Sequence, residues 1–171
     1  MWSPERLLCS VWLAAILVLP GCGYHMSASA PIALPESMTT LYLEKVSNPT
    51  TQSWLEPTLR STLRDEFTRR GQVRWVEKHQ AEGLLEIGIV SFTSGTKLEN
   101  ALEETVRSEI VLQLQATISR KADQTVAWDS GRITARESFN GPKGSTEARD
   151  AEQRVVDLAV EKLADTLGQE F

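Results

Sequence analysis

Residues 106–119 read VRSEIVLQLQATIS, and the order of apolar and polar side chains in this stretch decides the fold. From Ile110 to Ile118 every second position is apolar, and most of the positions between them are polar. A period of two is typical of a strand that has one face in a core. The stretch therefore predicts a long strand whose other face is wet or available to a partner.

The segments before this strand also carry strand and helix patterns. Strands are predicted over residues 39–46, 73–76 and 84–93, and a helix over residues 53–70. From Leu55 to Phe67 the helix has an apolar side chain at every fourth position, which forms one stripe for packing. Gly71 follows the helix and can supply its left-handed cap. The order strand, helix, strand favours a right-handed parallel crossover.

Two connections flank the long strand. A polar loop is predicted over residues 94–103, and a turn over residues 122–124. The turn leads into a fifth strand over residues 125–139, in which the apolar positions change phase after Gly131. A change of phase within a strand indicates a bulge, because one extra residue turns the following side chains to the other face.

An amphipathic helix closes the chain. It is predicted to begin at Ser145 or Thr146 and to run to about Leu167, which is long enough to cross a sheet. The elements together predict one domain over residues 38–171. Its fold class is α+β: a two-layer sandwich with two helices packed on one face of a mixed four- to five-stranded sheet.

The N-terminus has the pattern of an export signal. Residues 7–19 are an apolar run of 13 residues, shorter than the about 20 that a membrane-spanning helix needs. Residues 1–21 are therefore predicted to be a signal peptide that is removed. The motif Leu19-Pro20-Gly21-Cys22 resembles the lipobox of bacterial lipoproteins, which implies acylation of Cys22 and a lipidated tether over residues 22–37. The alternative is an ordinary cleaved signal with an incidental cysteine.

Composition and motifs exclude several function classes. The chain has 18 Lys and Arg against 23 Asp and Glu, a net charge of −5 that argues against nucleic-acid binding. His25 and His79 have no partner at metal-ligand spacing, so no metal site or cofactor is predicted. No nucleophile elbow or phosphate-binding glycine loop occurs, which leaves an envelope hydrolase as the weakest hypothesis.

Three stretches and the order of elements carry a family resemblance. The stretches are Gly21-Cys22-Gly23-Tyr24-His25-Met26, Leu34-Pro35-Glu36-Ser37-Met38 before the first strand, and Ala148-Arg149-Asp150-Ala151-Glu152-Gln153 at the start of the last helix. From Gly21 onward the chain resembles the lipopolysaccharide-assembly lipoprotein family, LptE. The resemblance covers nearly all of the mature chain.

The resemblance implies a role without catalysis. Members of the family sit inside the β-barrel LptD and help to deliver lipopolysaccharide to the outer leaflet of the outer membrane. They bind lipopolysaccharide through basic residues, and Lys97, Arg149 and the nearby Lys143 fall at comparable positions here. Gly23 follows Cys22, where an aspartate is the usual signal for retention in the inner membrane. The resemblance therefore implies a lipid anchor in the outer membrane, facing the periplasm and the barrel lumen.

A different interaction module remains as the alternative. Periplasm-facing lipoproteins that activate a cell-wall synthase or serve a secretion apparatus also show a strand that ends like residues 46–50, followed by a helix. They usually have a long disordered tether, whereas residues 22–37 form a short one. A short tether keeps the domain at the membrane, which favours the barrel subunit.

Cys22→Ala is expected to abolish acylation. The thiol of Cys22 is the proposed attachment atom, and alanine offers no substitute. Labelled palmitate should enter the wild-type chain and be absent from the variant after gel separation. Incorporation of label into the variant would show that the lipobox interpretation is wrong.

Overall fold

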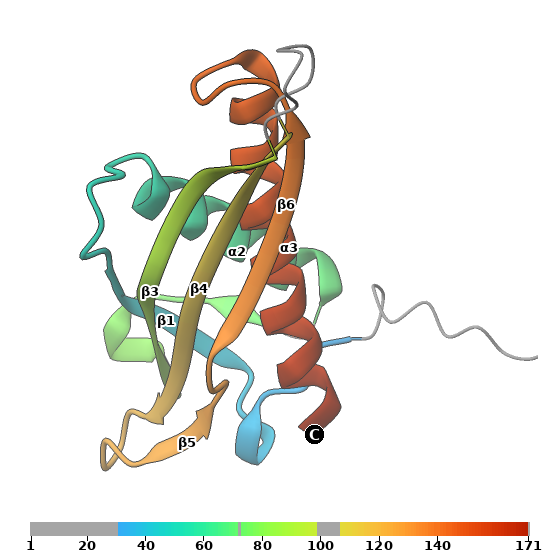
Figure 1. Ribbon diagram of the computed structural model, residues 1–171. Helices are drawn as coiled ribbons and strands as arrows, with labels where there is room; N and C mark the ends of the chain where they lie inside the picture. The colour runs from blue at the N-terminus through green and yellow to red at the C-terminus, as the bar shows by residue number, and fades with distance from the viewer. Residues whose placement is uncertain (1–30, 72, 99–106, 171) are drawn as a thin grey trace, which may run out of the picture.

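The computed structural model describes residues 31–71, 73–98 and 107–170. Their elements are, in chain order, η2 (Pro35–Ser37), β1 (Thr40–Ser47), α2 (Leu55–Arg70), β2 (Arg74–Trp75), η3 (Lys78–Gln80), β3 (Gly83–Leu98), β4 (Arg107–Arg120), β5 (Val126–Asp129), β6 (Ile133–Asn140) and α3 (Thr146–Glu170). The two α-helices lie together behind the strands (Figure 1). The predicted α+β class, with helices on a mixed sheet, is confirmed.

The sheet is mixed because its two halves have different connections. The strand order is β2-β1-β3-β4-β5, and β6 pairs with β4 beyond the end of β5. β1 is parallel to both β2 and β3, whereas β4 is antiparallel to β3, β5 and β6. The predicted parallel crossover between the first two strands is thus present, with α2 as its connection.

β3 is longer than the sequence predicts. It continues to Leu98, so the polar loop predicted over residues 94–103 is wrong over its first five residues. The reason is the pairing with β4: Ser94 faces Ile110 and Leu98 faces Arg107 in the antiparallel register. Main-chain hydrogen bonds to β4 hold these residues whatever their side chains, which a polarity pattern does not reveal. Residues 99–103 lie outside the described part of the chain.

The predicted fifth strand is two strands, β5 and β6. Gly131 interrupts it with a φ of 60°, a conformation that glycine adopts easily. Between the pairs Thr117–Asp129 and Leu114–Ile133, three residues oppose two on β4. This is the bulge expected at Gly131, and it keeps both Trp128 and Ile133 on the buried face.

The core lies between the sheet and the two helices. α3 buries more of its surface than its predicted stripe, because it packs on β4, β6 and α2 together. Val156, Val160 and Ala164 are fully buried in addition to the stripe formed by Ala151, Val155, Ala159, Leu163 and Leu167. The chain before β1 also belongs to the core, since Ile32 and Leu34 are buried within it.

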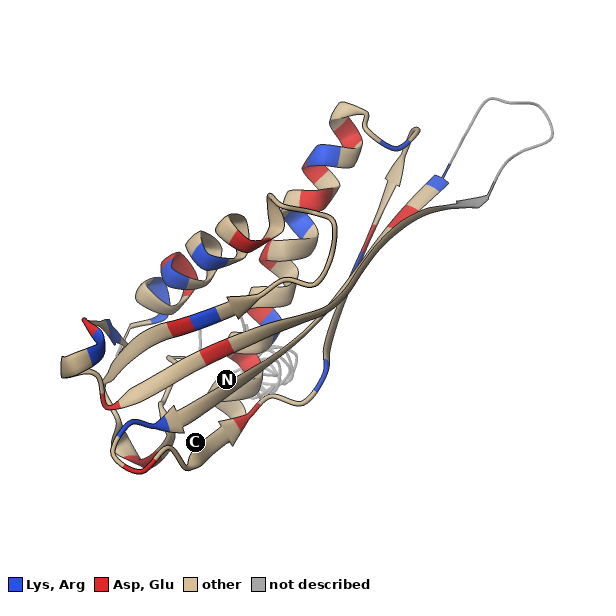
Figure 2. Cartoon of the chain, turned by 90° about the vertical axis from the view of Figure 1, so that its left-hand side faces the viewer, with Lys and Arg blue, Asp and Glu red and all other residues tan. Residues whose placement is uncertain are grey.

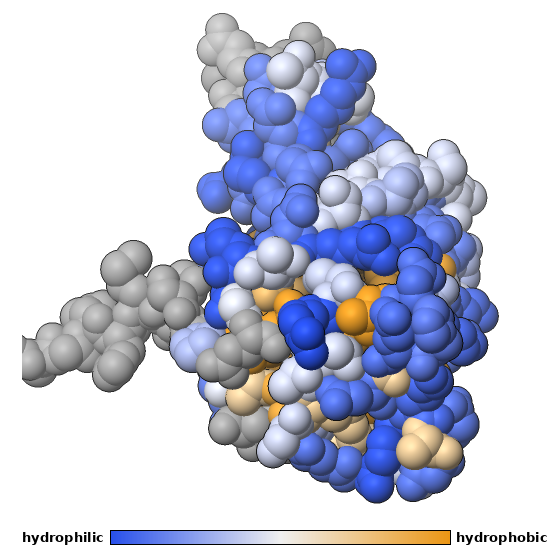
Figure 3. Space-filling view, turned by 180° about the vertical axis from the view of Figure 1, so that it is seen from behind, coloured by the Kyte–Doolittle hydropathy of each residue, from blue (hydrophilic) through white to orange (hydrophobic). Residues whose placement is uncertain are grey.

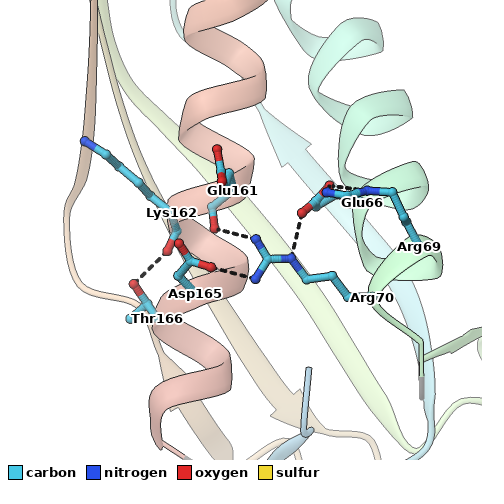
Figure 4. Close-up of polar contacts among 7 residues, drawn as sticks. All are labelled: Glu66, Arg69, Arg70, Glu161, Lys162, Asp165 and Thr166. Atoms are coloured by element: carbon cyan, nitrogen blue, oxygen red, sulfur yellow. Dashed lines mark hydrogen bonds and ion pairs between the residues drawn. The ribbon is translucent and has the colours of Figure 1, made fainter. Parts of the chain in front are cut away.

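An ion-pair cluster joins the two helices where α2 ends (Figure 4). The guanidinium of Arg70, only 1% exposed, donates to Glu66 of its own helix at 2.6 Å and to Asp165 of α3 at 2.6 Å. Arg70 also donates to the Glu161 carbonyl at 3.4 Å, and Arg69 pairs with Glu66 at 2.6 Å. A buried guanidinium needs such partners, so the cluster fixes the ends of α2 and α3 relative to each other.

Glu66→Gln is expected to reduce the free energy of unfolding at neutral pH. It should also make that free energy fall less steeply as the pH is lowered. Burial raises the pKa of the Glu66 carboxyl, but hydrogen bonds from Arg69 and Arg70 outweigh it and hold the pKa below the usual 4.5. A carboxyl with a lowered pKa in the folded state stabilises the fold above its unfolded pKa, and that stabilisation is lost as pH falls through the folded value. Urea unfolding at pH 7 should show a loss of about 1–2 kcal/mol, with a smaller difference from wild type below about pH 4.

Glu56→Gln is the matched control for this change. Glu56 lies on the same helix and pairs with Arg60 at 3.5 Å, but both side chains are more than a third exposed. Exposed pairs of this kind contribute little, so the loss should stay below about 0.5 kcal/mol. Equal losses for the two variants would show that the Arg70 cluster does not stabilise the fold.

Candidate functional site

The structure places the predicted binding residues at one end of the molecule. Lys97 lies on the C-terminal part of β3, Lys143 in the loop between β6 and α3, and Arg149 in the first turns of α3. All three segments lie toward the upper end in Figure 1. Cys22, the predicted acylation site, lies outside the described residues.

The pairing of the strands brings Arg107 to the same end, a cation that the sequence pattern does not single out. Arg107, the exposed first residue of β4, faces Leu98 of β3 on one side and Asn140 of β6 on the other. It therefore lies between the segments that carry Lys97 and Lys143. We call the four residues Lys97, Arg107, Lys143 and Arg149 the basic end. Residue spacing gives no signal for this grouping, because it depends on which strands pair.

A buried serine and a helix cap hold the loop of the basic end. Ser108 is 3% exposed, and its hydroxyl donates to the carbonyl of Gly141 at 3.0 Å. The Ser145 hydroxyl accepts the Ala148 N–H at 3.2 Å, which caps α3. The first turn of α3 and the start of β4 are thus attached to the same short loop, so Lys143 and Arg149 project from a fixed base.

The electrostatics of the basic end are mixed. Lys143 and Arg149 are exposed, and within the described residues neither forms an ion pair. The pKa of the Glu147 carboxyl is lowered because its own main-chain N–H and the Ser145 hydroxyl donate to it. Figure 2 shows cations and carboxylates interspersed where β6 joins α3. The arrangement can hold separate anionic groups by local contacts, and it is not a continuous basic surface.

Two further surface cations, Arg120 and Lys121, are already engaged by the protein. Arg120 donates to Glu36 at 2.8 Å, and Lys121 donates to the carbonyl of His79 at 2.6 Å. Both line a pocket of about 530 Å³ together with Glu82. The Glu82 carboxylate accepts the main-chain N–H of Thr39 at 2.7 Å, which lowers its pKa. These cations and carboxylates fasten the chain before β1, at the end of the molecule opposite the basic end (Figure 1).

The outer face of the sheet is mostly polar, with Glu86, Glu109 and Arg136 as charged members and Val90 and Val111 as apolar ones. Its half-buried or exposed side chains alternate with the core residues of β3, β4 and β6: Ser91, Thr93, Gln113, Gln115, Thr117, Thr134, Arg136 and Ser138. The Ser91 hydroxyl donates to Gln113 at 3.2 Å, and Gln115 donates to Asp129 at 2.9 Å. Both helices cover the other face of the sheet (Figure 1). Seen from behind, the surface on the helix side is hydrophilic in its upper part and shows hydrophobic patches lower down (Figure 3).

The described residues contain neither a cluster of metal ligands nor a membrane-spanning helix. No group of three or more His, Cys, Asp or Glu side chains is placed there to hold a metal ion. None of the helices in this part of the chain is long and apolar enough to span a membrane.

Comparison with solved structures finds lipoproteins of low sequence identity. Lipoprotein B of Nitrosomonas europaea, an uncharacterised protein, is 16% identical with a TM-score of 0.47, covering 82% of this chain and 83% of that chain. A minor lipoprotein of Acinetobacter baumannii is 14% identical with a TM-score of 0.46, covering 78% and 92%. Rare lipoprotein B of Shewanella oneidensis is 16% identical with a TM-score of 0.43, covering 77% and 92%.

No curated protein matches the chain, but a family model does. The family model for lipopolysaccharide assembly, LptE, matches residues 38–169, which include every α-helix and strand that the structure describes apart from the last residue of α3. The chain therefore belongs to the LptE lipopolysaccharide-assembly family.

Proposed function

We propose that this chain is an outer-membrane lipoprotein subunit of the lipopolysaccharide translocon. In this role it occupies the lumen of the β-barrel LptD, binds lipopolysaccharide and has no catalytic step. The family match over residues 38–169 is the observation that carries the proposal. It also favours this role over the alternative of a lipoprotein that activates a cell-wall synthase or serves a secretion apparatus.

The outer face of the sheet supports a place inside a barrel. Many of its side chains are hydroxyls and amides, such as Thr93, Gln113 and Thr134. Barrel interiors are usually polar and wet, so a polar face can lie against such a wall with its hydrogen-bonding groups still satisfied. A partner with an apolar surface would leave these groups without hydrogen bonds.

The basic end supports contact with phosphorylated lipid. Phosphate oxygens are bound well by Arg and Lys side chains, through charge-assisted hydrogen bonds. Arg107, Lys143 and Arg149 are exposed there, and the Ser108 and Ser145 contacts hold the loop between them. The net charge of −5 does not oppose this contact, because the cations act locally.

The described chain begins at the end of the fold opposite the proposed ligand site. Pro31 lies close to Gly168, near the C-terminal end of α3, whereas Arg149 is near the start of that helix. About 28 Å of helix separates Arg149 from Gly168. A lipid on Cys22 would hold the Pro31 end near the membrane and leave the basic end to project away from the anchor.

Affinity purification of the tagged chain from outer membranes should recover a large β-barrel protein. The expected partner follows from the family and from the polar sheet face. Mass spectrometry of the recovered material identifies it, and an untagged strain is the control. Recovery of a peptidoglycan synthase without a barrel would favour the alternative function instead.

Arg149→Glu is expected to weaken lipopolysaccharide binding about tenfold or more, because it replaces an attractive charge by a repulsive one. Binding of purified lipopolysaccharide should be measured at fixed salt, with thermal unfolding to show that the fold is intact. Arg64→Glu is the matched control, since Arg64 is an exposed cation on α2, away from the basic end. Equal binding by wild type and Arg149→Glu would remove Arg149 from the site.

A further inference from the structure

β6 forms an open edge of the sheet. It pairs with β4 along one side only, and no described strand lies on its other side (Figure 1). β6 has eight residues, whereas β2 at the opposite edge of the sheet has two. Open edges present unpaired main-chain N–H and C=O groups, which are a template for a further strand.

Two contacts establish which residues of β6 face outward. Ala116 of β4 turns its main-chain N–H and C=O toward Ser130, so the even-numbered residues of β4 bond in the direction of β5 and β6. In the β4–β6 register, even-numbered residues of β4 face odd-numbered residues of β6. The main-chain groups of Thr134, Arg136 and Ser138 therefore point away from β4.

The second contact comes from α3. Lys162 donates through Nζ to the carbonyl oxygen of Thr134 at 2.9 Å, on the side away from β4. Within the described residues this is the one hydrogen bond made to the outward main-chain groups of Thr134, Arg136 and Ser138. Most of this edge is thus left to solvent or to a partner.

The side chains beside the edge specify the charge of an incoming strand. α3 runs behind β6 and places Arg154, half-buried Leu158 and Lys162 one turn apart along it. Arg154 is already paired with Glu137 at 2.7 Å, whereas within the described residues the Lys162 ammonium contacts only the Thr134 carbonyl. A carboxylate on an added strand would therefore find Lys162 as its partner.

We propose that β6 receives an extended segment of the barrel partner as an added strand, with an acidic side chain of that segment beside Lys162. The proposal rests on the proposed function for the identity of the partner. A second copy of this chain fits the edge poorly. Antiparallel pairing of two β6 strands centred on Thr134, Arg136 or Glu137 would bring Lys162, Arg136 or Glu137 near its own counterpart, and such like-charge pairs are unfavourable.

Proline substitutions test the proposal because they remove a main-chain N–H. Arg136→Pro and Ser138→Pro each remove an outward N–H and place the ring where the added strand would lie, and proline is tolerated on open edges. Recovery of the barrel with the tagged full-length chain should fall about tenfold, the effect of losing one or two main-chain hydrogen bonds. Thermal unfolding should remain cooperative for both variants.

Two controls separate the main chain from the side chain and from the fold. Arg136→Ala keeps the outward N–H, so barrel recovery should stay within about twofold of wild type, since only an exposed side chain is lost. Glu137→Pro removes an N–H that bonds to β4 and should lower the unfolding temperature. If both outward proline variants also unfold, their N–H groups serve the fold itself and the proposal is wrong.

The remaining outcomes distinguish this proposal from the proposed function. Full barrel recovery by both folded proline variants would overturn the added strand and leave the translocon role intact. Absence of a barrel from the wild-type purification would overturn the translocon role. A dimer of the purified chain that Arg136→Pro dissolves would show that a second copy occupies the edge, which also overturns the proposal.

Discussion

The antiparallel pairing of β3 with β4 is the contact on which the other elements depend. It runs from Gly83 opposite Arg120 to Leu98 opposite Arg107, the full length of both strands. β1 is attached to one side of this pair, and β5 and β6 to the other. The helices then cover the apolar face that the pair creates. Because a strand's side chains alternate, the same pairing also produces the polar outer face.

The sequence was sufficient for the elements whose side chains repeat with a clear period. The alternation from Ile110 to Ile118 predicted β4, and the four-residue spacing from Leu55 to Phe67 predicted α2. The end of β3 was missed because residues 94–98 are held by main-chain pairing. The burial of Arg70 was missed for a related reason: its partner Asp165 is far away in the sequence. An arginine at a helix end normally indicates a solvated side chain.

The candidate site was predicted residue by residue, but its grouping was not. Lys97, Lys143 and Arg149 entered through the family resemblance, and each belongs to a different element. The register of β3, β4 and β6 brings those elements to one end and adds Arg107. Arg120 and Lys121 look like the other cations in the sequence, yet their contacts with Glu36 and His79 give them a structural role. Only tertiary structure separates the two kinds of cation.

The bulge at Gly131 limits how this family member can change its length. Trp128 before it and Ile133 after it both point into the core, although the residues opposite them on β4 are separated by one position fewer. Deleting one residue between them would remove the extra residue and leave Trp128 and Ile133 four positions apart, which still places both on the buried face. Inserting one residue would instead add a second residue that β4 cannot pair. Gly131 has a φ of 60°, and the Ser130 hydroxyl accepts the main-chain N–H of Ala116, so these two positions also resist substitution. Among relatives, loss of one residue should therefore be commoner in this segment than an insertion.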